Sequence, residues 1–324
     1  MKAQEVKKRM NESGKKRTPF LFAIDFDMKK GFFVENPLEQ TSILFNTPLG
    51  GNKPESVSTQ HSIPFEMTPF PMPYSEYRRL FDSVMQGLMR GDSYLANLTI
   101  RTLIQTELSL KHIFLLSRSP YSIFVPDNFV CFSPERFVRI SNGIISTNPM
   151  KGTISTETPD AEQRILSDLK ETAEHCTIVD LMRNDIGMVA ENVSVERFRY
   201  IDRIHSLTGE ILQVCSEITG KLPNDYLSHL GNIIFRMLPA GSVSGAPKQS
   251  TLEIIHKAES APRGYYTGVF GYFDGQELDS AVLIRFIGQY EDKLFFHSGG
   301  GITVNSNPES EYDEILKKIY LPFV

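Results

Sequence analysis

The hydrophobic pattern of the chain begins with two short apolar runs near the N-terminus. FLFAIDFD (20–27) and FFVEN (32–36) flank the turn-forming residues MKKG. Apolar runs of this length around a short polar turn predict a β-hairpin. Residues 47–74 are rich in Pro, Gly, Ser and Thr, and therefore predict a loop or an irregular connection.

The rest of the first half combines one helix with a series of short strands. Apolar side chains recur at helical spacing over 75–89, at Tyr77, Leu80, Phe81, Val84 and Leu88. The runs that follow alternate poorly and break at Pro and Gly, which favours antiparallel strands over βαβ units. They cover 95–106, 121–126, 128–134, 135–142 and 143–149.

The second half is predicted to mix helices and strands. Thr158 and Pro159 supply an N-cap and a first-turn proline for a helix that ends at Gly187. Asn307 and Pro308 mark the start of the last helix in the same way. Between them we expect helices near 221–236 and 246–259, and strands over 265–273, 280–290 and 293–302.

Long strands are thus expected in both halves of the chain, with helices between them. The sequence has no internal repeat, and no linker divides it cleanly. We therefore predict an α+β fold in which residues 18–324 form one interwoven body whose sheets draw on the whole chain.

Composition and charge exclude several classes of protein. The 324 residues are 40% apolar and 23% charged, which is ordinary for a folded chain, and the net charge of −5 argues against general nucleic-acid binding. No apolar run approaches the roughly 20 residues of a membrane span, and no signal peptide is recognisable. Three cysteines without metal-binding spacing, Cys131, Cys176 and Cys215, predict reduced, buried thiols and a cytoplasmic protein.

The charge is uneven along the chain. Residues 1–17 carry seven Lys and Arg against Glu5 and Glu12, a net charge of +5, which leaves −10 for the remainder. Such a segment suits either a docking arm or a flexible, solvated terminus. We favour the second interpretation and predict a flexible basic tail outside the fold.

Three glutamates are candidates for a metal site. Glu311 and Glu314 are three residues apart near the start of the last predicted helix, so their carboxylates project from one face. Acids at this end of a helix also offset its dipole. Glu174 precedes His175 in mid-helix, where a structural ion pair is the alternative. Carboxylates from separate helices would suit Mg²⁺, but spacing alone leaves both interpretations open.

Two glycine-rich segments suggest contact with an anion. GSVSGAPK (241–248) departs from the Walker pattern because Ala246 and Pro247 separate the second glycine from the lysine. Its backbone N–H groups would still suit a carboxylate. SGGG (298–301) permits the close approach of an anion or simply a tight turn. Taken singly, Lys151 and Glu135 are typical of surface residues.

Eight segments taken together, and in order, carry a family resemblance. They are SPERF (133–137), PMKGT (149–153), AEHCTIVDLMRNDIG (173–187), IHSLTGE (204–210), LPAGSVSGAPK (238–248), PRGYYTGVFG (262–271), AVLIR (281–285) and GGGITVNSNPESEYDE (299–314). This series resembles the chorismate-utilising enzymes over about residues 75–324, with 18–74 as a shortened N-terminal part. The resemblance implies two large, mainly antiparallel sheets packed as a sandwich and wrapped by helices, with the active site in the cleft between them.

The resemblance also implies a set of site residues. It places a Mg²⁺ ion, which bridges to a substrate carboxylate, at Glu174, Glu311 and Glu314. It implies that chorismate is bound by Thr153, Ser244, Tyr266, Arg285, Gly300 and Gly301. It makes His205 an active-site histidine, and it assigns catalytic roles to Lys151 and Glu135.

Lys151 selects a branch of the family. The lysine of PMKGT resembles the aminodeoxychorismate branch, in which it attacks C2 of chorismate while the C4 hydroxyl leaves; ammonia then adds at C4 and expels the lysine. Glu135 would protonate the departing hydroxyl. The amine must be free to attack, so we expect burial or a neighbouring cation to lower the pKa of Lys151, and the environment of Glu135 to raise its pKa.

Three departures from the family pattern bear on this interpretation. Leu95 stands where the water-adding branch has lysine and cannot activate water, and Asn148 and Phe286 replace residues common near the substrate. Alternatives are anthranilate synthase component I and a catalytically lapsed binding or regulatory subunit.

No cysteine has a glutaminase setting such as GxCxG. We therefore expect a separate glutamine amidotransferase subunit to deliver ammonia, with the product serving 4-aminobenzoate and folate biosynthesis.

Overall fold

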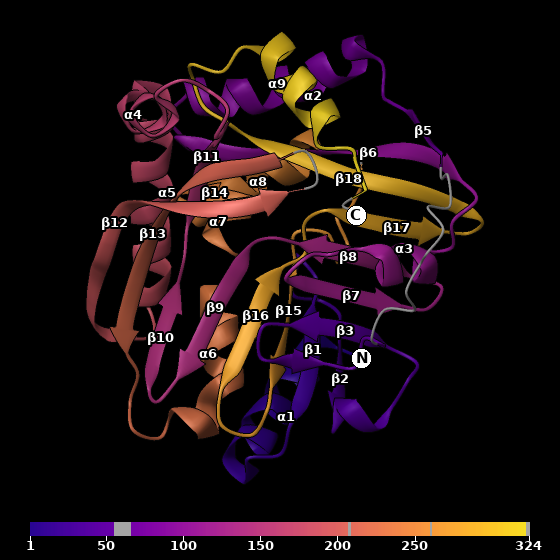
Figure 1. The fold of residues 1–324 in the computed structure, drawn as a ribbon, viewed down its shortest axis with the longest axis vertical. Helices are drawn as coiled ribbons and strands as arrows, with labels where there is room; N and C mark the ends of the chain where they lie inside the picture. The colour runs from indigo at the N-terminus through magenta and orange to yellow at the C-terminus, as the bar shows by residue number, and fades with distance from the viewer. Residues whose placement is uncertain (55–65, 207–208, 260, 322–324) are drawn as a thin grey trace.

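The structure is a computed structural model that describes residues 1–54, 66–206, 209–259 and 261–321. Its strands form two nine-stranded sheets, and every strand pair with a stated register is antiparallel. Figure 1 shows the two sheets in different orientations, with helices around them. This confirms the predicted α+β class.

The first sheet combines strands from all parts of the chain. In spatial order it contains β11 (Met150–Ser155), β13 (Gly209–Lys221), β10 (Ile144–Thr147), β9 (Arg136–Ser141), β16 (Leu278–Val282), β15 (Val269–Phe273), β1 (Phe20–Ile24) and β2 (Gly31–Glu35), with β12 (Glu191–Ser206) paired to β13. The expected hairpin is present as β1 and β2, and β1 pairs on its other side with β15.

The second sheet is interwoven in the same way. Its order is β14 (Gly245–Ala246), β6 (Leu95–Thr106), β18 (Lys293–Ile302), β17 (Phe286–Tyr290), β8 (Phe129–Ser133), β7 (Tyr121–Val125), β3 (Leu44–Thr47) and β4 (Gly50–Gly51), with β5 (Met67–Phe70) paired to β6. Buried apolar side chains from both sheets share one cluster, which includes Leu21, Phe270, Ile123 and Phe129. That shared core holds the sheets against each other.

Helices surround the sheets. They are α1 (Ala3–Lys16), α2 (Tyr74–Met89), α3 (Leu110–Leu116), α4 (Ala161–Ser167), α5 (Leu169–Gly187), α6 (Leu230–Met237), α7 (Gly241–Ser244), α8 (Lys248–Ala258) and α9 (Pro308–Lys317), with 3₁₀ turns η1 (Pro37–Glu39) and η2 (Tyr226–His229). Asn307 Oδ1 accepts a hydrogen bond from Ser310 N at 3.0 Å, so the predicted N-cap of α9 is confirmed. Among the described residues, no helix is long and apolar enough to cross a membrane.

The N-terminal segment corrects one expectation. Residues 3–16 are not a tail outside the fold, because they form α1 and pack on β1, β2, η2 and α6. Val6 and Met10 are fully buried on one face of the helix. Gly14 allows contact with the η2 backbone, since a Cβ there would lie 2.2 Å from Leu227 O. The many Lys and Arg residues of this segment suggested a solvated tail. In the structure, Lys8 and Lys15 are exposed on the side of the helix opposite the buried apolar face.

Three further local expectations are corrected. The helix expected from Thr158 begins at Ala161 and is interrupted at Asp168, whose carboxylate caps a second helix by accepting from Glu171 N at 3.0 Å. The helix expected over 221–236 is shorter, since β13 runs to Lys221 and α6 covers only residues 230–237. The long β12–β13 hairpin was not predicted. Cys131 and Cys215 are buried thiols as expected, whereas Cys176 is exposed.

Candidate active site

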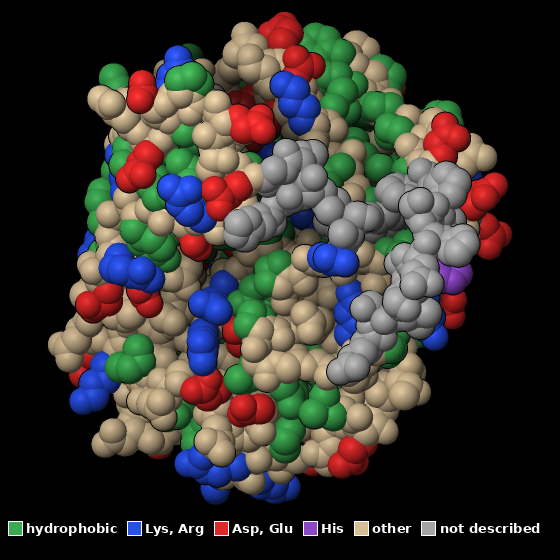
Figure 2. All heavy atoms as spheres, viewed as in Figure 1, with side chains coloured by type: hydrophobic (Ala, Val, Ile, Leu, Met, Phe, Trp, Pro, Cys, Tyr) green, Lys and Arg blue, Asp and Glu red, His purple; other side chains and the backbone are tan. Residues whose placement is uncertain are grey.

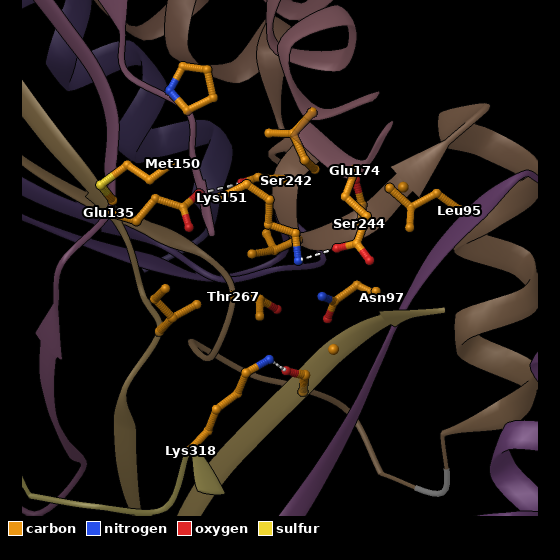
Figure 3. A pocket seen from close by; sticks show the side chains of 18 of the residues that line it. Leu95, Asn97, Glu135, Met150, Lys151, Glu174, Ser242, Ser244, Thr267 and Lys318 are labelled. Atoms are coloured by element: carbon orange, nitrogen blue, oxygen red, sulfur yellow. Dashed lines mark hydrogen bonds and ion pairs between the residues drawn. The ribbon is translucent and has the colours of Figure 1, made fainter. Parts of the chain in front are cut away.

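The site lies in a cleft with a volume of about 220 Å³. Residues of β11, α5, α7, β6 and β18 line it, together with Lys318 at the end of α9, and Figure 3 shows several of their side chains. Eight of the predicted site residues line it: Glu135, Lys151, Glu174, Ser244, Tyr266, Arg285, Gly300 and Gly301. Motifs far apart in the sequence therefore converge on one cavity.

Lys151 reaches the cleft from an irregular point in β11. The pairing of β11 with β13 shifts register between Met150 and Thr153, so Lys151 and Gly152 form a local bulge. Gly152 has φ +83°, a conformation that favours glycine. Thr153 follows the bulge with an exposed side chain and is not among the lining residues.

The charge environment of Lys151 differs from the expectation. Its Nζ is 2.7 Å from Glu174 Oε2 on α5 (Figure 3). Burial lowers the pKa of Lys151, but the carboxylates of Glu174, Glu314 and Glu171 act against it, and the net direction is upward. The predicted lowering of this pKa is therefore wrong, because the pair with Glu174 favours the ammonium form of Lys151.

Glu135 has the environment expected of an acid. It lies between β8 and β9 and lines the cleft. Burial raises its pKa, and a hydrogen bond from Ser242 and the charge of Lys151 offset this only in part. The next residue, Arg136, is bound by the buried carboxylate of Asp279 at 3.2 Å. The backbone that carries Glu135 is therefore anchored beside the cleft.

Two motif residues brace the short helix α7 and do not line the cleft. Asp185 accepts a hydrogen bond from Gly241 N at 2.9 Å, and it also binds Lys248 Nζ at 2.8 Å. Burial raises the pKa of Asp185, and the Lys248 ammonium opposes this effect. The pair between Asp185 and Lys248 fixes α7, and with it Ser242 and Ser244, at the cavity wall.

A different part of the wall presents positive charge and open backbone. Arg285 has φ +52°, and its guanidinium carbon lies 4.9 Å from the ring of Tyr320. Its Nε is buried without a hydrogen-bond partner among the described residues. At Gly300 an added Cβ would face Glu311 Oε2 at 3.5 Å and Lys318 Nζ at 3.8 Å, so a side chain here would extend over both groups.

Sequence reasoning missed Lys318 at this wall. Lys318, labelled in Figure 3, donates from its Nζ to Gly299 O at 2.8 Å. The same Nζ pairs with Glu314 Oε1 at 2.8 Å. The i,i+4 spacing of Glu314 and Lys318 on the predicted last helix was the available signal. Ser242 was also missed, although it lies two residues before Ser244 in the same glycine-rich segment.

The proposed metal ligands have the right chemistry, and one of them, Glu174, lines the cleft. Glu174 and Glu314 both act on Lys151, and Glu311 lies beyond Gly300 with Oε1 accepting from Ser306 at 2.8 Å. Oxygen ligands of this kind suit Mg²⁺. In the described part of the chain, however, no three acidic, His or Cys side chains converge on one point, and lysines hold Glu174 and Glu314.

The remaining expectations fall on other parts of the fold. His205 lies in β12 opposite Glu210, and its side chain is outside the described part of the chain. Leu95 lines the cleft. Asn148 does not line it, and instead accepts from Arg136 Nη1 at 2.8 Å. Phe286 stacks on Phe129 in the core, with ring centroids 4.8 Å apart, so aromatic packing explains this departure.

Comparison with known proteins agrees with this geometry. A Haemophilus influenzae protein described as an uncharacterized PabA-like protein is 51% identical over 314 residues, 96% of this chain and 94% of its own. Aminodeoxychorismate synthase component 1 of Salmonella typhimurium is 34% identical over 260 residues. The matched region covers 75% of this chain and 56% of that relative's length.

A solved structure and a family model also match this chain. The crystal structure of anthranilate synthase component I from Streptococcus pneumoniae matches with a TM-score of 0.66 and 28% identity, over 79% of this chain and 58% of that one. The model of a chorismate binding enzyme matches residues 34–322. The chain therefore belongs to the family of chorismate binding enzymes.

Proposed function

We propose that the protein is the synthase component that converts chorismate and ammonia to 4-amino-4-deoxychorismate. The observation that carries this proposal is the position of Lys151, whose ammonium group lies in the cleft that Glu135 also lines. A lysine and a carboxyl group of raised pKa in one cavity supply a nucleophile and an acid. The 34% identity with an aminodeoxychorismate synthase component supports the assignment.

The cleft suits a dicarboxylate such as chorismate. Arg285 and Lys318 place two positive charges on one wall, beside the open backbone of Gly299 and Gly300. The Nε of Arg285 has no hydrogen-bond partner within the described part of the chain, and an acceptor on the substrate would satisfy this buried donor. Apolar side chains such as Leu95, Met150 and Ile178 line the rest.

The proposed reaction has two displacements. The neutral amine of Lys151 forms a bond to C2 of chorismate, the ring double bond shifts, and the C4–O bond breaks. Glu135 gives its proton to the departing hydroxyl, which leaves as water. Ammonia then forms a bond to C4, the double bond shifts back, and the C2–N bond to Lys151 breaks, so the amine is restored.

The pair between Lys151 and Glu174 must open before this reaction starts. An ammonium group has no lone pair, and the 2.7 Å contact with Glu174 favours the charged form. We infer that Glu174, Glu311 and Glu314 hold Mg²⁺ in the working enzyme. The ion would supply charge neutralisation for a substrate carboxylate, and a Glu174 carboxylate engaged as its ligand would no longer pair with Lys151.

We further propose that ammonia comes from a separate glutamine amidotransferase subunit. The designation of the Salmonella relative as component 1 supports a multi-component enzyme. The product would then pass to a lyase that releases 4-aminobenzoate.

A product assay tests the proposal. Purified protein is incubated with chorismate, Mg²⁺ and ammonium, and the lyase is added afterwards; 4-aminobenzoate is the expected product. Fluorescent anthranilate as the main product would instead support anthranilate synthase component I, which the shared scaffold motivates. No turnover, even with a cognate glutaminase, would indicate a catalytically lapsed subunit. Intact-mass measurement of a chorismate adduct that disappears in Lys151→Ala checks the covalent step.

A further inference from the structure

The contact between Glu135 and Ser242 joins two walls of the cleft. Ser242 Oγ donates a hydrogen bond to Glu135 Oε1 at 2.6 Å, between residues 107 positions apart in the sequence (Figure 3). Both residues line the cavity. In the part of the chain that the structure describes, no other side chain hydrogen-bonds to the Glu135 carboxylate.

The Glu135 end of this hydrogen bond is held through its backbone. Glu135 N donates to Ser133 Oγ at 3.1 Å, and Glu135 O accepts from Val282 N at 3.2 Å. Backbone bonds of this kind leave the carboxyl group free to rotate about its own side-chain torsions. The Ser242 hydroxyl is therefore the group that selects one orientation.

The Ser242 end is also rigid. Gly241 N donates to Asp185 Oδ2 at 2.9 Å, and Val243 O accepts from Arg263 Nη1 at 2.9 Å. The residues on both sides of Ser242 are thus tied to buried charged groups. A hydroxyl on such a support keeps its position when the cleft is empty, which is what pre-organisation requires.

We propose that Ser242 is a positioning residue for Glu135, whose hydroxyl engages Oε1 so that Oε2 carries the acid proton into the cleft. This inference rests on the proposed function, in which Glu135 protonates the departing C4 hydroxyl and water is released. Ser242 itself transfers no proton in this step. Its effect is to restrict the direction from which the proton is delivered.

The direction of the electrostatic effect follows from the same geometry. A hydroxyl that donates to a carboxylate stabilises the charged form, so loss of Ser242 raises the pKa of Glu135. The other charged or titratable groups lining the cleft are Lys151 (β11), Glu174 (α5), Tyr266, Arg285, His297 (β18) and Lys318. Of these, Lys151 acts on Glu135 by its charge. Behind the wall, Asp185 pairs with Lys248 and Arg136 with Asp279.

Direct titration of Glu135 tests the contact without any assumption about the reaction. Protein labelled with ¹³C at the glutamate carboxyl carbons is titrated by NMR, and Glu135→Gln identifies the resonance. We expect Ser242→Ala to move its midpoint to higher pH and Ser242→Thr, which keeps a hydroxyl, to restore it. Ser42→Ala, which removes an exposed hydroxyl far from the cleft, should change nothing.

Kinetics test the positioning role. We expect kcat for Ser242→Ala to fall about tenfold, a fraction of the roughly 10²–10⁴-fold that a placed general acid supplies. The decline of kcat/KM at high pH, which follows deprotonation of Glu135, should move upward in pH. Ser242→Thr should recover most of kcat, and the KM for chorismate should change less than kcat.

Two results would overturn the proposal. One is a Glu135 midpoint that does not move in Ser242→Ala. The other is a loss of kcat by one factor at every pH, since a purely structural role would produce it. Failure of the proposed function has a different signature: the wild-type enzyme would form no aminodeoxychorismate, whereas the Glu135 titration would still shift.

Discussion

The two lysines of the cleft have similar exposure and opposite electrostatic environments. The side chain of Lys151 is 36% exposed and that of Lys318 is 27% exposed. Burial lowers the pKa of both. For Lys151, the carboxylates of Glu174, Glu314 and Glu171 reverse the direction, whereas for Lys318 the opposing effect of the Glu314 carboxylate does not.

Neighbouring charges explain the difference. Burial, together with the charges of Lys151 and Arg285, lowers the pKa of Lys318 and outweighs the opposing effect of Glu314. The lysine that the family motif marks as a nucleophile is therefore held as an ammonium group, and the one that sequence reasoning missed is less strongly protonated. Burial lowers the pKa of both amines, and the carboxylates near each one decide whether that effect is reversed. Figure 2, which has the same view as Figure 1, shows Lys and Arg side chains interspersed with Asp and Glu side chains over this face of the molecule.

The largest expected effect is the loss of catalysis when Lys151 is replaced. Lys151→Ala should lower kcat for aminodeoxychorismate formation by roughly 10³-fold or more, because removal of a nucleophile eliminates the covalent route. Lys317→Ala, which changes an exposed lysine of α9, is the matched control. The measurement is coupled 4-aminobenzoate formation at saturating ammonium. Retention of full activity by Lys151→Ala would remove the functional distinction between the two lysines.

The second effect is weaker binding of chorismate when Lys318 is replaced. Lys318→Ala should raise the KM for chorismate about tenfold and change kcat less, because one charged hydrogen bond contributes roughly 1.5–3 kcal/mol and 1.4 kcal/mol is a factor of ten. Steady-state kinetics against chorismate separate the two parameters. A loss in kcat as large as that of Lys151→Ala would show that Lys318, not Lys151, takes part in the chemical step.

A third prediction concerns the charge on Lys151 alone. Glu174→Gln removes the first carboxylate that raises the pKa of Lys151, so that pKa should fall, and the neutral amine should appear at lower pH. Competitive acylation followed by peptide mass spectrometry, in the presence of a chelator, measures this for both lysines in one sample. Glu174 is not among the groups that act directly on Lys318, so that lysine should shift less and in the opposite direction, because a neutral Lys151 no longer lowers its pKa. Glu162→Gln, at an exposed position of α4, should affect neither lysine.

The smallest expected effect concerns Glu314, whose carboxylate acts on both lysines. Glu314 raises the pKa of both lysines, so Glu314→Gln should lower both, and Lys318 more, because it also loses the direct 2.8 Å pair. The same acylation experiment gives the two midpoints. A response confined to Lys318 would mean that Glu314 does not act on Lys151, and that the two lysines have no carboxylate in common.

Much of the fold followed from local sequence. The β1–β2 hairpin, helix α2 and the Asn307 cap of α9 arise from signals within a few residues, and each is present near its predicted bounds. Helix α1 was missed because seven basic side chains obscured an apolar face of only three residues, Ala3, Val6 and Met10. That face becomes meaningful only where α6 and η2 cover it.

The sequence by itself determined the family and the identity of eight residues that line the cleft, because ordered motifs record which side chains the site contains. Tertiary structure alone decided which of these charges lie against each other. It paired Lys151 with Glu174, placed Lys318 beside Gly300, and set Ser242 against Glu135. Protonation depends on distances of a few ångströms between groups far apart in the chain, and motif spacing does not contain those distances.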